Sequence, residues 1–116
     1  MYTIYHNPRC KKSREALSYL DDSKVEVQRI LYLETPFTKS TLDEVFKKIK
    51  KQPSEVLRKN EADWKSLPNK NQLTENEILE AMVRFPKIIE RPIVTSEKDG
   101  VLARPLENLI SFLKTH

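Results

Sequence analysis

The chain opens with MYTIYHNPRCKKSREALSYL (residues 1–20), which combines an expected strand, a polar loop and an expected helix. The apolar run from Tyr2 to Tyr5 is typical of a strand, and Ser13 to Leu20 carries apolar side chains on one helical face, namely Ala16, Leu17 and Leu20. Cys10, the single cysteine of the chain, lies between the two elements. A thiol at a helix start faces unpaired N–H groups and the positive end of the helix dipole, which both favour the thiolate. Cys10 is therefore a candidate nucleophile.

Cys10 also has a purely structural interpretation, because a free cysteine is among the most buried residue types and packs as a small hydrophobe. Its neighbours are mostly polar or cationic side chains that would not line a core, and they comprise His6, Asn7, Pro8, Arg9, Lys11, Lys12, Ser13 and Arg14. This local setting favours a reactive thiol over a core residue.

Length and composition favour one small domain. The chain has 116 residues, of which 38% are hydrophobic and 33% charged, enough for a single core. No apolar run approaches the roughly 20 residues needed to span a bilayer, and Met1 leads directly into the first expected strand without the pattern of a signal peptide. We expect no membrane association and a cytoplasmic location.

The net charge of +4 raises the question of a nucleic-acid partner. The densest basic run, residues 47–51, lies on an expected helix whose other face is apolar, and no aromatic stacking pair flanks it. A solvated helix face explains this run, and the arginines are scattered singly. We therefore expect no direct nucleic-acid binding, and an anion pocket assembled by folding fits the arginines better.

The middle of the chain is predicted to be mostly helical. Val25, Val27 and Ile30-Leu31 indicate a second strand before it. Thr38 to Ser40 offer N-caps for an amphipathic helix with apolar residues at i, i+3, i+4 and i+7, namely Leu42, Val45, Phe46 and Ile49. A helical turn is expected from Pro53 to Leu57, followed by a polar loop from Arg58 to Asn71 that Trp64 and Leu67 anchor to the core.

The last part of the chain predicts a helix, a hairpin and a final helix. The capping box Thr74-x-x-Glu77 precedes an apolar stripe of Ile78, Leu79, Met82 and Val83, and Pro86 ends that helix. Pro92 to Thr95 and Val101 to Ala103 are expected strands, joined at Asp99-Gly100, where the only glycine is expected at positive φ. Pro105 suits the first position of a last helix, with Leu106, Leu109, Ile110 and Leu113 facing inward.

This order of elements predicts an α/β, thioredoxin-like fold: a small mixed four-stranded sheet flanked by helices, with parallel pairing in the first half and a hairpin in the second. One domain covers residues 1–116, with a helical insertion at about residues 38–86. Cys10 is then expected at the carboxyl end of the first strand, where open α/β sheets place their sites.

The sequence around Cys10 excludes several kinds of cysteine chemistry. A Cys-x-x-Cys dithiol is absent because residue 13 is Ser13, and a phosphatase loop would need an arginine where Ala16 stands. Neither His6 nor His116 stands at a metal-ligand spacing from Cys10, so no metal is expected. Because the chain has one cysteine, redox chemistry would need a second thiol from another molecule.

Two neighbours of Cys10 keep more than one interpretation. His6 could stabilise a thiolate or be a structural histidine at a strand end. The Ser13 hydroxyl could donate to the Cys10 sulfur, cap the first helix, or do both.

Five motifs together resemble the glutaredoxin-coupled arsenate reductase family: YHNPRCKKSR (5–14), ILYLETP (30–36), LRKN (57–60), ERPIV (90–94) and ARP (103–105). The resemblance runs from residue 1 to about 113 and implies a thioredoxin-like fold with a helical insertion. It implies that Cys10 attacks arsenate or a similar oxyanion and that three arginines hold that anion, the matching positions being Arg58, Arg91 and Arg104. Supporting roles are expected for His6, Asn7, Ser13, Arg14 and Pro92.

The resemblance further implies glutathione as co-substrate and glutaredoxin as protein partner, with no bound cofactor; we expect a monomer. Pro92 would be the cis proline opposite the nucleophile, the other interpretation being a trans proline that opens an edge strand. Guanidinium groups suit this chemistry because they bind oxyanion oxygens in pairs and offset repulsion between the anion and a thiolate. The same superfamily includes Spx-like regulators that bind RNA polymerase without arsenate chemistry, and this remains the alternative function.

Overall fold

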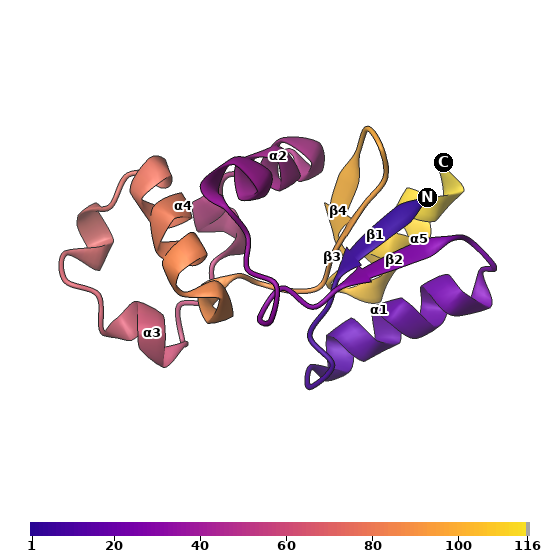
Figure 1. Cartoon of the computed structure of the whole chain (residues 1–116), viewed down its shortest axis with the longest axis horizontal. Coiled ribbons are helices and arrows are strands. Elements are labelled where there is room, and N and C mark those ends of the chain that lie inside the picture. The colour runs from indigo at the N-terminus through magenta and orange to yellow at the C-terminus, as the bar shows by residue number, and fades with distance from the viewer. Residues whose placement is uncertain (116) are drawn as a thin grey trace.

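The computed structural model describes residues 1–115. Its four short strands are rich in β-branched and aromatic residues and form one mixed sheet, in the order β2-β1-β3-β4 (Figure 1). The strands are β1 (Tyr2–Tyr5), β2 (Val27–Ile30), β3 (Ile93–Thr95) and β4 (Gly100–Leu102). β1 pairs with β2 in parallel and with β3 antiparallel, and β3 and β4 form an antiparallel hairpin. The predicted mixed four-stranded sheet is confirmed, while His116 lies outside the described residues.

Alternation along the strands gives the sheet two apolar faces. Ile4 and its partner Val94 point into a cluster with α1 (Lys11–Asp22) and α5 (Leu106–Lys114). Ile93 points to the opposite face, into a larger cluster with α2 (Lys39–Ile49). The predicted helices on both faces are confirmed. Phe112 is buried in the first cluster although its inward position was not predicted.

Beyond α2 the chain extends away from the sheet in a group of short helices (Figure 1). These are η1 (Pro53–Val56), α3 (Ala62–Lys65), η2 (Lys70–Gln72), α4 (Glu75–Arg84) and η3 (Pro86–Ile88). The predicted capping box starts α4: Glu77 N–H donates to Thr74 Oγ1 at 3.2 Å, and Thr74 N–H donates to Glu77 Oε1 at 3.0 Å. Trp64 is buried and Leu67 packs against the same core, as predicted. α2 itself packs against β3 and β4.

Gly100 does not have the positive φ predicted for it. The hairpin turn lies one residue earlier, because Ser96 N–H donates to the Asp99 carbonyl at 2.7 Å and Gly100 already pairs with Thr95 as the first residue of β4. Glycine is needed there for space: a Cβ would lie 2.8 Å from Ile49 Cγ2 and 2.9 Å from Thr95 Cγ2.

Two helix starts differ from the predicted positions. α1 begins at Lys11, two residues before Ser13, with Cys10 as its N-cap, and α5 begins at Leu106, with Pro105 as N-cap rather than first helical residue. The peptide bond before Pro92 is cis, which confirms the prediction, and the bond before Pro105 is cis as well. Among the described residues, no helix combines the length and apolar character needed to cross a membrane.

Candidate active site

The loop that follows β1 folds tightly so that Cys10 begins α1. Cys10 N–H donates to the Asn7 carbonyl at 3.0 Å, and the Arg9 N–H donates to the Asn7 side-chain oxygen at 3.0 Å. Arg14 N–H donates to the Cys10 carbonyl at 3.0 Å, and its guanidinium donates to the Pro8 carbonyl at 2.9 Å. Arg14 therefore folds back over the loop.

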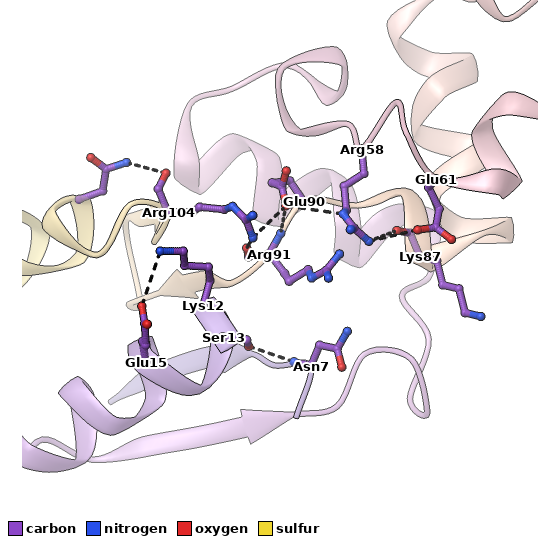
Figure 2. A network of polar contacts seen from close by, with 11 residues as sticks. Asn7, Lys12, Ser13, Glu15, Arg58, Glu61, Lys87, Glu90, Arg91 and Arg104 are labelled. Carbon is purple, nitrogen blue, oxygen red and sulfur yellow. Dashed lines mark hydrogen bonds and ion pairs between the residues drawn. The ribbon is translucent and has the colours of Figure 1, made fainter. Parts of the chain in front are cut away.

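The Ser13 hydroxyl connects this loop to the side chain of His6. Its Oγ lies 2.6 Å from His6 Nδ1. The same Oγ accepts the Asn7 N–H at 3.0 Å (Figure 2). The N-cap role considered for this hydroxyl is wrong, because Cys10 occupies the N-cap position of α1 while Ser13 Oγ joins His6 to the loop. His6 is buried, and its pKa is lowered by that burial and by the charges of Arg29 and Arg14. A neutral His6 hydrogen-bonded to Ser13 agrees with the structural interpretation of this histidine.

Cys10 is only 7% exposed, yet its surroundings favour the thiolate. Burial by itself raises the pKa of the thiol, but the backbone N–H groups of Ser13 and Lys12 and the side chain of Arg91 together lower it below the ordinary value. The two N–H groups belong to the first turn of α1, whose N–H groups have no partner within the helix. The sulfur does not close a regular capping hydrogen bond with them, so their effect is that of nearby dipoles.

Arg91 comes to Cys10 from the segment that leads into β3. The cis bond to Pro92 follows it directly, and its guanidinium acts on the thiol both as a donor and as a positive charge. Its Nε is buried and has no hydrogen-bond partner among the described residues. A buried donor without a partner is uncommon in folded proteins, so this N–H group still lacks an acceptor among the described residues.

Arg58 and Arg104 converge on Glu90, the residue before Arg91. Glu90 Oε1 lies 3.8 Å from Arg58 Nε and 3.6 Å from Arg104 Nη1, and Figure 2 shows Glu90 between the two guanidinium groups. Arg104 Nη1 also donates to the Arg91 carbonyl at 3.5 Å. Arg58, Arg91 and Arg104 are separated by 13 to 46 residues in the sequence, and they thus surround one short segment.

Further partners orient Arg58. Its Nη1 donates to Glu61 Oε2 at 3.2 Å and to the Lys87 carbonyl at 3.4 Å (Figure 2). The Arg58 side chain is 31% exposed and that of Arg104 is 39% exposed. Both side chains are therefore partly buried and partly accessible to solvent at the surface of the site. Each retains N–H groups that can turn toward an oxyanion.

Tyr32 lies beside Glu90 and Arg91 and was not predicted as part of the site. It is almost fully buried, and with Tyr5 and Phe37 it lines a narrow space beside Glu90 and Arg91. Burial raises the pKa of Tyr32 to about 12, although the charges of Arg91 and Arg58 oppose the rise. The phenol is therefore neutral at physiological pH. Tyr32 belongs to the ILYLETP motif, and this motif was the sequence signal that could have identified it as a site residue.

The described residues include no group of three His, Cys, Asp or Glu side chains arranged to hold a metal ion. What the structure brings together is a thiol with a lowered pKa, three guanidinium groups and one carboxylate. This arrangement suits attack by sulfur on a small anion, because the positive charges offset repulsion between the two negative partners.

Comparison with known proteins agrees with this fold. The model of the ArsC family matches residues 5–112.

The chain belongs to the ArsC family.

Relatives of this ArsC-family chain match it along almost its whole length. The protein YfgD of Escherichia coli K12 is 39% identical over 112 residues, covering 95% of this chain and 94% of YfgD. An arsenate reductase of Neisseria meningitidis is 36% identical over 112 residues, covering 95% of this chain and 96% of that protein. The solved structure of an arsenate reductase from Vibrio cholerae superposes with a TM-score of 0.87 at 33% identity, covering 95% of each chain. The predicted family and thioredoxin-like fold are confirmed.

Proposed function

We propose that this protein reduces arsenate, or a closely similar oxyanion, to arsenite through a covalent bond between Cys10 and arsenic. The observation that carries the proposal is the guanidinium of Arg91 beside a Cys10 thiol of lowered pKa, with Arg58 and Arg104 converging next to it. Relatives named arsenate reductase at 33 to 36% identity support this choice of substrate.

Anion binding is the first step. The buried Nε of Arg91 has no partner and offers one donor, and Arg58 and Arg104 offer further N–H groups. Each hydrogen bond to a charged group contributes about 1.5–3 kcal/mol before desolvation is subtracted. The same charges allow the Cys10 thiolate to approach an anion that would otherwise repel it.

The chemical steps keep atoms and electrons in balance. The Cys10 sulfur forms a bond to arsenic, and one arsenate oxygen leaves as water after taking two protons, so arsenic stays As(V). Glutathione then adds its sulfur to the same arsenic, displacing a second oxygen as water. A glutaredoxin thiolate attacks the glutathione sulfur; the new disulfide forms, and the electron pair of the broken sulfur–arsenic bond reduces As(V) to As(III). Water then cleaves the Cys10–As(III) bond and releases arsenite.

An external thiol is required because the chain has only one cysteine. Glutathione and glutaredoxin are the donors we propose, and they place the reaction in the cytoplasm, where thiols are kept reduced. Convergence of the arginines on one carboxylate oxygen favours this enzyme over the Spx-like regulator, because an oxyanion site has no purpose in polymerase binding.

A coupled assay with arsenate, glutathione, glutaredoxin and an NADPH-linked reductase tests the proposal. We expect turnover by the parent protein and none by Cys10→Ser. Arg58→Gln and Arg104→Gln are expected to raise KM, whereas Arg84→Gln, whose side chain stacks on Phe85 at 5.1 Å, serves as the matched control.

Two results would contradict the proposal. Turnover that survives Cys10→Ser would remove the thiol from the mechanism. A parent protein that reduces no arsenate, but is captured together with RNA polymerase subunits, would favour the regulator.

A further inference from the structure

The Glu90 carboxylate occupies the middle of the arginine group. One of its oxygens, Oε1, has three positively polarised neighbours: Arg58 Nε at 3.8 Å, Arg104 Nη1 at 3.6 Å and the Arg91 N–H, which donates to it at 3.2 Å. Two of the contacts are longer than a hydrogen bond, so the guanidinium groups are attracted to the carboxylate without being locked to it.

This carboxylate oxygen has the surroundings expected for an oxygen of a bound oxyanion. Its neighbours are two guanidinium groups and a backbone N–H, the donor set that proteins use for phosphate-like anions. The Glu90 side chain is 26% exposed, which leaves it room to turn outward. Glu61 is not equivalent: among the described residues its carboxylate contacts only Nη1 of Arg58, and it comes from the outer group of helices.

We propose that Glu90 is an internal counter-anion that an incoming oxyanion displaces from Arg58 and Arg104, and that it thereby sets the affinity of the site. This inference rests on the proposed function, since it concerns the same pocket. A carboxylate attached to the chain beside its partners competes at a high effective concentration. Glu90 offsets part of the positive charge of the pocket when it is empty, and binding is an exchange of one anion for another.

Removal of the Glu90 charge has opposite effects on anion binding depending on whether Glu90 competes with the anion or positions the arginines. If Glu90 held the arginines in a productive geometry, its removal would weaken anion binding. Because it competes for them, replacement of its charge strengthens binding. Glu90→Gln keeps the size of the side chain and removes the charge, so the sign of the change separates the two roles.

Calorimetric titration of sulfate and of arsenate into Cys10→Ser, with and without Glu90→Gln, tests the inference without requiring turnover. We expect Glu90→Gln to tighten both anions about tenfold, equivalent to ~1.4 kcal/mol. In the parent background it is expected to lower KM for arsenate without raising kcat. Glu80→Gln, which removes an exposed partner of Lys39, is the control and should leave affinity unchanged.

Equal or weaker binding by Glu90→Gln, when Cys10→Ser itself binds the anions, would overturn the role of Glu90 and leave the anion pocket intact. Absence of binding by both proteins would overturn the pocket and the inference together. A crystal of the parent protein soaked in sulfate gives an independent measurement. We expect sulfate oxygens on Arg58 and Arg104 with Glu90 turned away; sulfate bound while Glu90 keeps both contacts would refute displacement.

Discussion

The stability of the loop that carries Cys10 depends on one atom, the side-chain oxygen of Ser13. Ser13 is fully buried, and its Oγ is the shared partner of His6 Nδ1 at 2.6 Å and of the Asn7 N–H at 3.0 Å. Ser13→Ala deletes that oxygen without changing the fold of α1, since alanine is a better helix former. The variant leaves a buried imidazole nitrogen and a half-buried backbone N–H without their partner.

The expected loss of stability follows from these two contacts. A buried polar group left without a partner costs about 1–3 kcal/mol. His6 is almost fully buried, whereas Asn7 is half-buried, so water can restore part of what the Asn7 N–H loses. We therefore expect Ser13→Ala to lower the free energy of unfolding by about 2 kcal/mol, a sum in which the His6 contact is the larger share.

Urea denaturation followed by circular dichroism measures this change. With an m-value of about 2 kcal/mol/M, the transition midpoint is expected to fall by about 1 M. Ser23→Ala is the matched control: its exposed Oγ donates to the Tyr19 carbonyl at 2.7 Å, and its removal should change stability by less than about 0.5 kcal/mol. A Ser13→Ala variant as stable as Ser23→Ala would refute the reasoning that this buried network holds the loop.

Three further predictions follow from the site and the sheet. Arg91→Gln is expected to raise the pKa of Cys10, because it removes a donor and a positive charge that lower it; iodoacetamide alkylation against pH measures this, and an unchanged midpoint would contradict the contact. Since burial raises the pKa of Tyr32 to about 12, its neutral form stabilises the fold below the ordinary tyrosine pKa of about 10, and that stability is lost as pH rises from about 10 toward 12. Absorbance titration of the parent protein should show a tyrosine that ionises at higher pH than the others, and Tyr32→Phe should lack this ionisation step. A parent protein that shows no such step would refute the raised pKa of Tyr32. Gly100→Ala is expected to cost about 1–3 kcal/mol by overpacking, and Ile49→Leu, which removes the Cγ2 atom 2.8 Å from the new Cβ, should restore part of it; additive effects of the two substitutions would argue against the clash.

Features that depend on neighbouring residues could be predicted from the sequence. The start of α1 near Cys10, the capping box at Thr74 and the hairpin strands all follow from patterns within a few residues. The errors lay at boundaries, where one residue decides which N–H groups are left unpaired. Cys10, not Ser13, is the N-cap of α1.

The arginines illustrate the limit of that local reasoning. Each of Arg58, Arg91 and Arg104 alone resembles a surface charge, and only the motifs around them indicated a shared site. The motifs could not show that Glu90 would lie among them, because its contacts join residues 14 to 32 positions away in the sequence. Tyr32 was missed for the same reason, as it lies beside Tyr5, Glu90 and Arg91, which belong to other segments.

By itself, the sequence determined the order of strands and helices, the position of the thiol after β1 and the presence of a single cysteine. These depend on hydrophobic period, helix capping and the count of one cysteine, all of which are local or compositional. Tertiary structure alone decided that Ser13 braces His6, that Gly100 is required by the closeness of Ile49, and that Glu90 lies between Arg58 and Arg104. The physical reason is that packing distances and charge pairs across the fold arise only when distant segments meet, and no pattern along the chain specifies them.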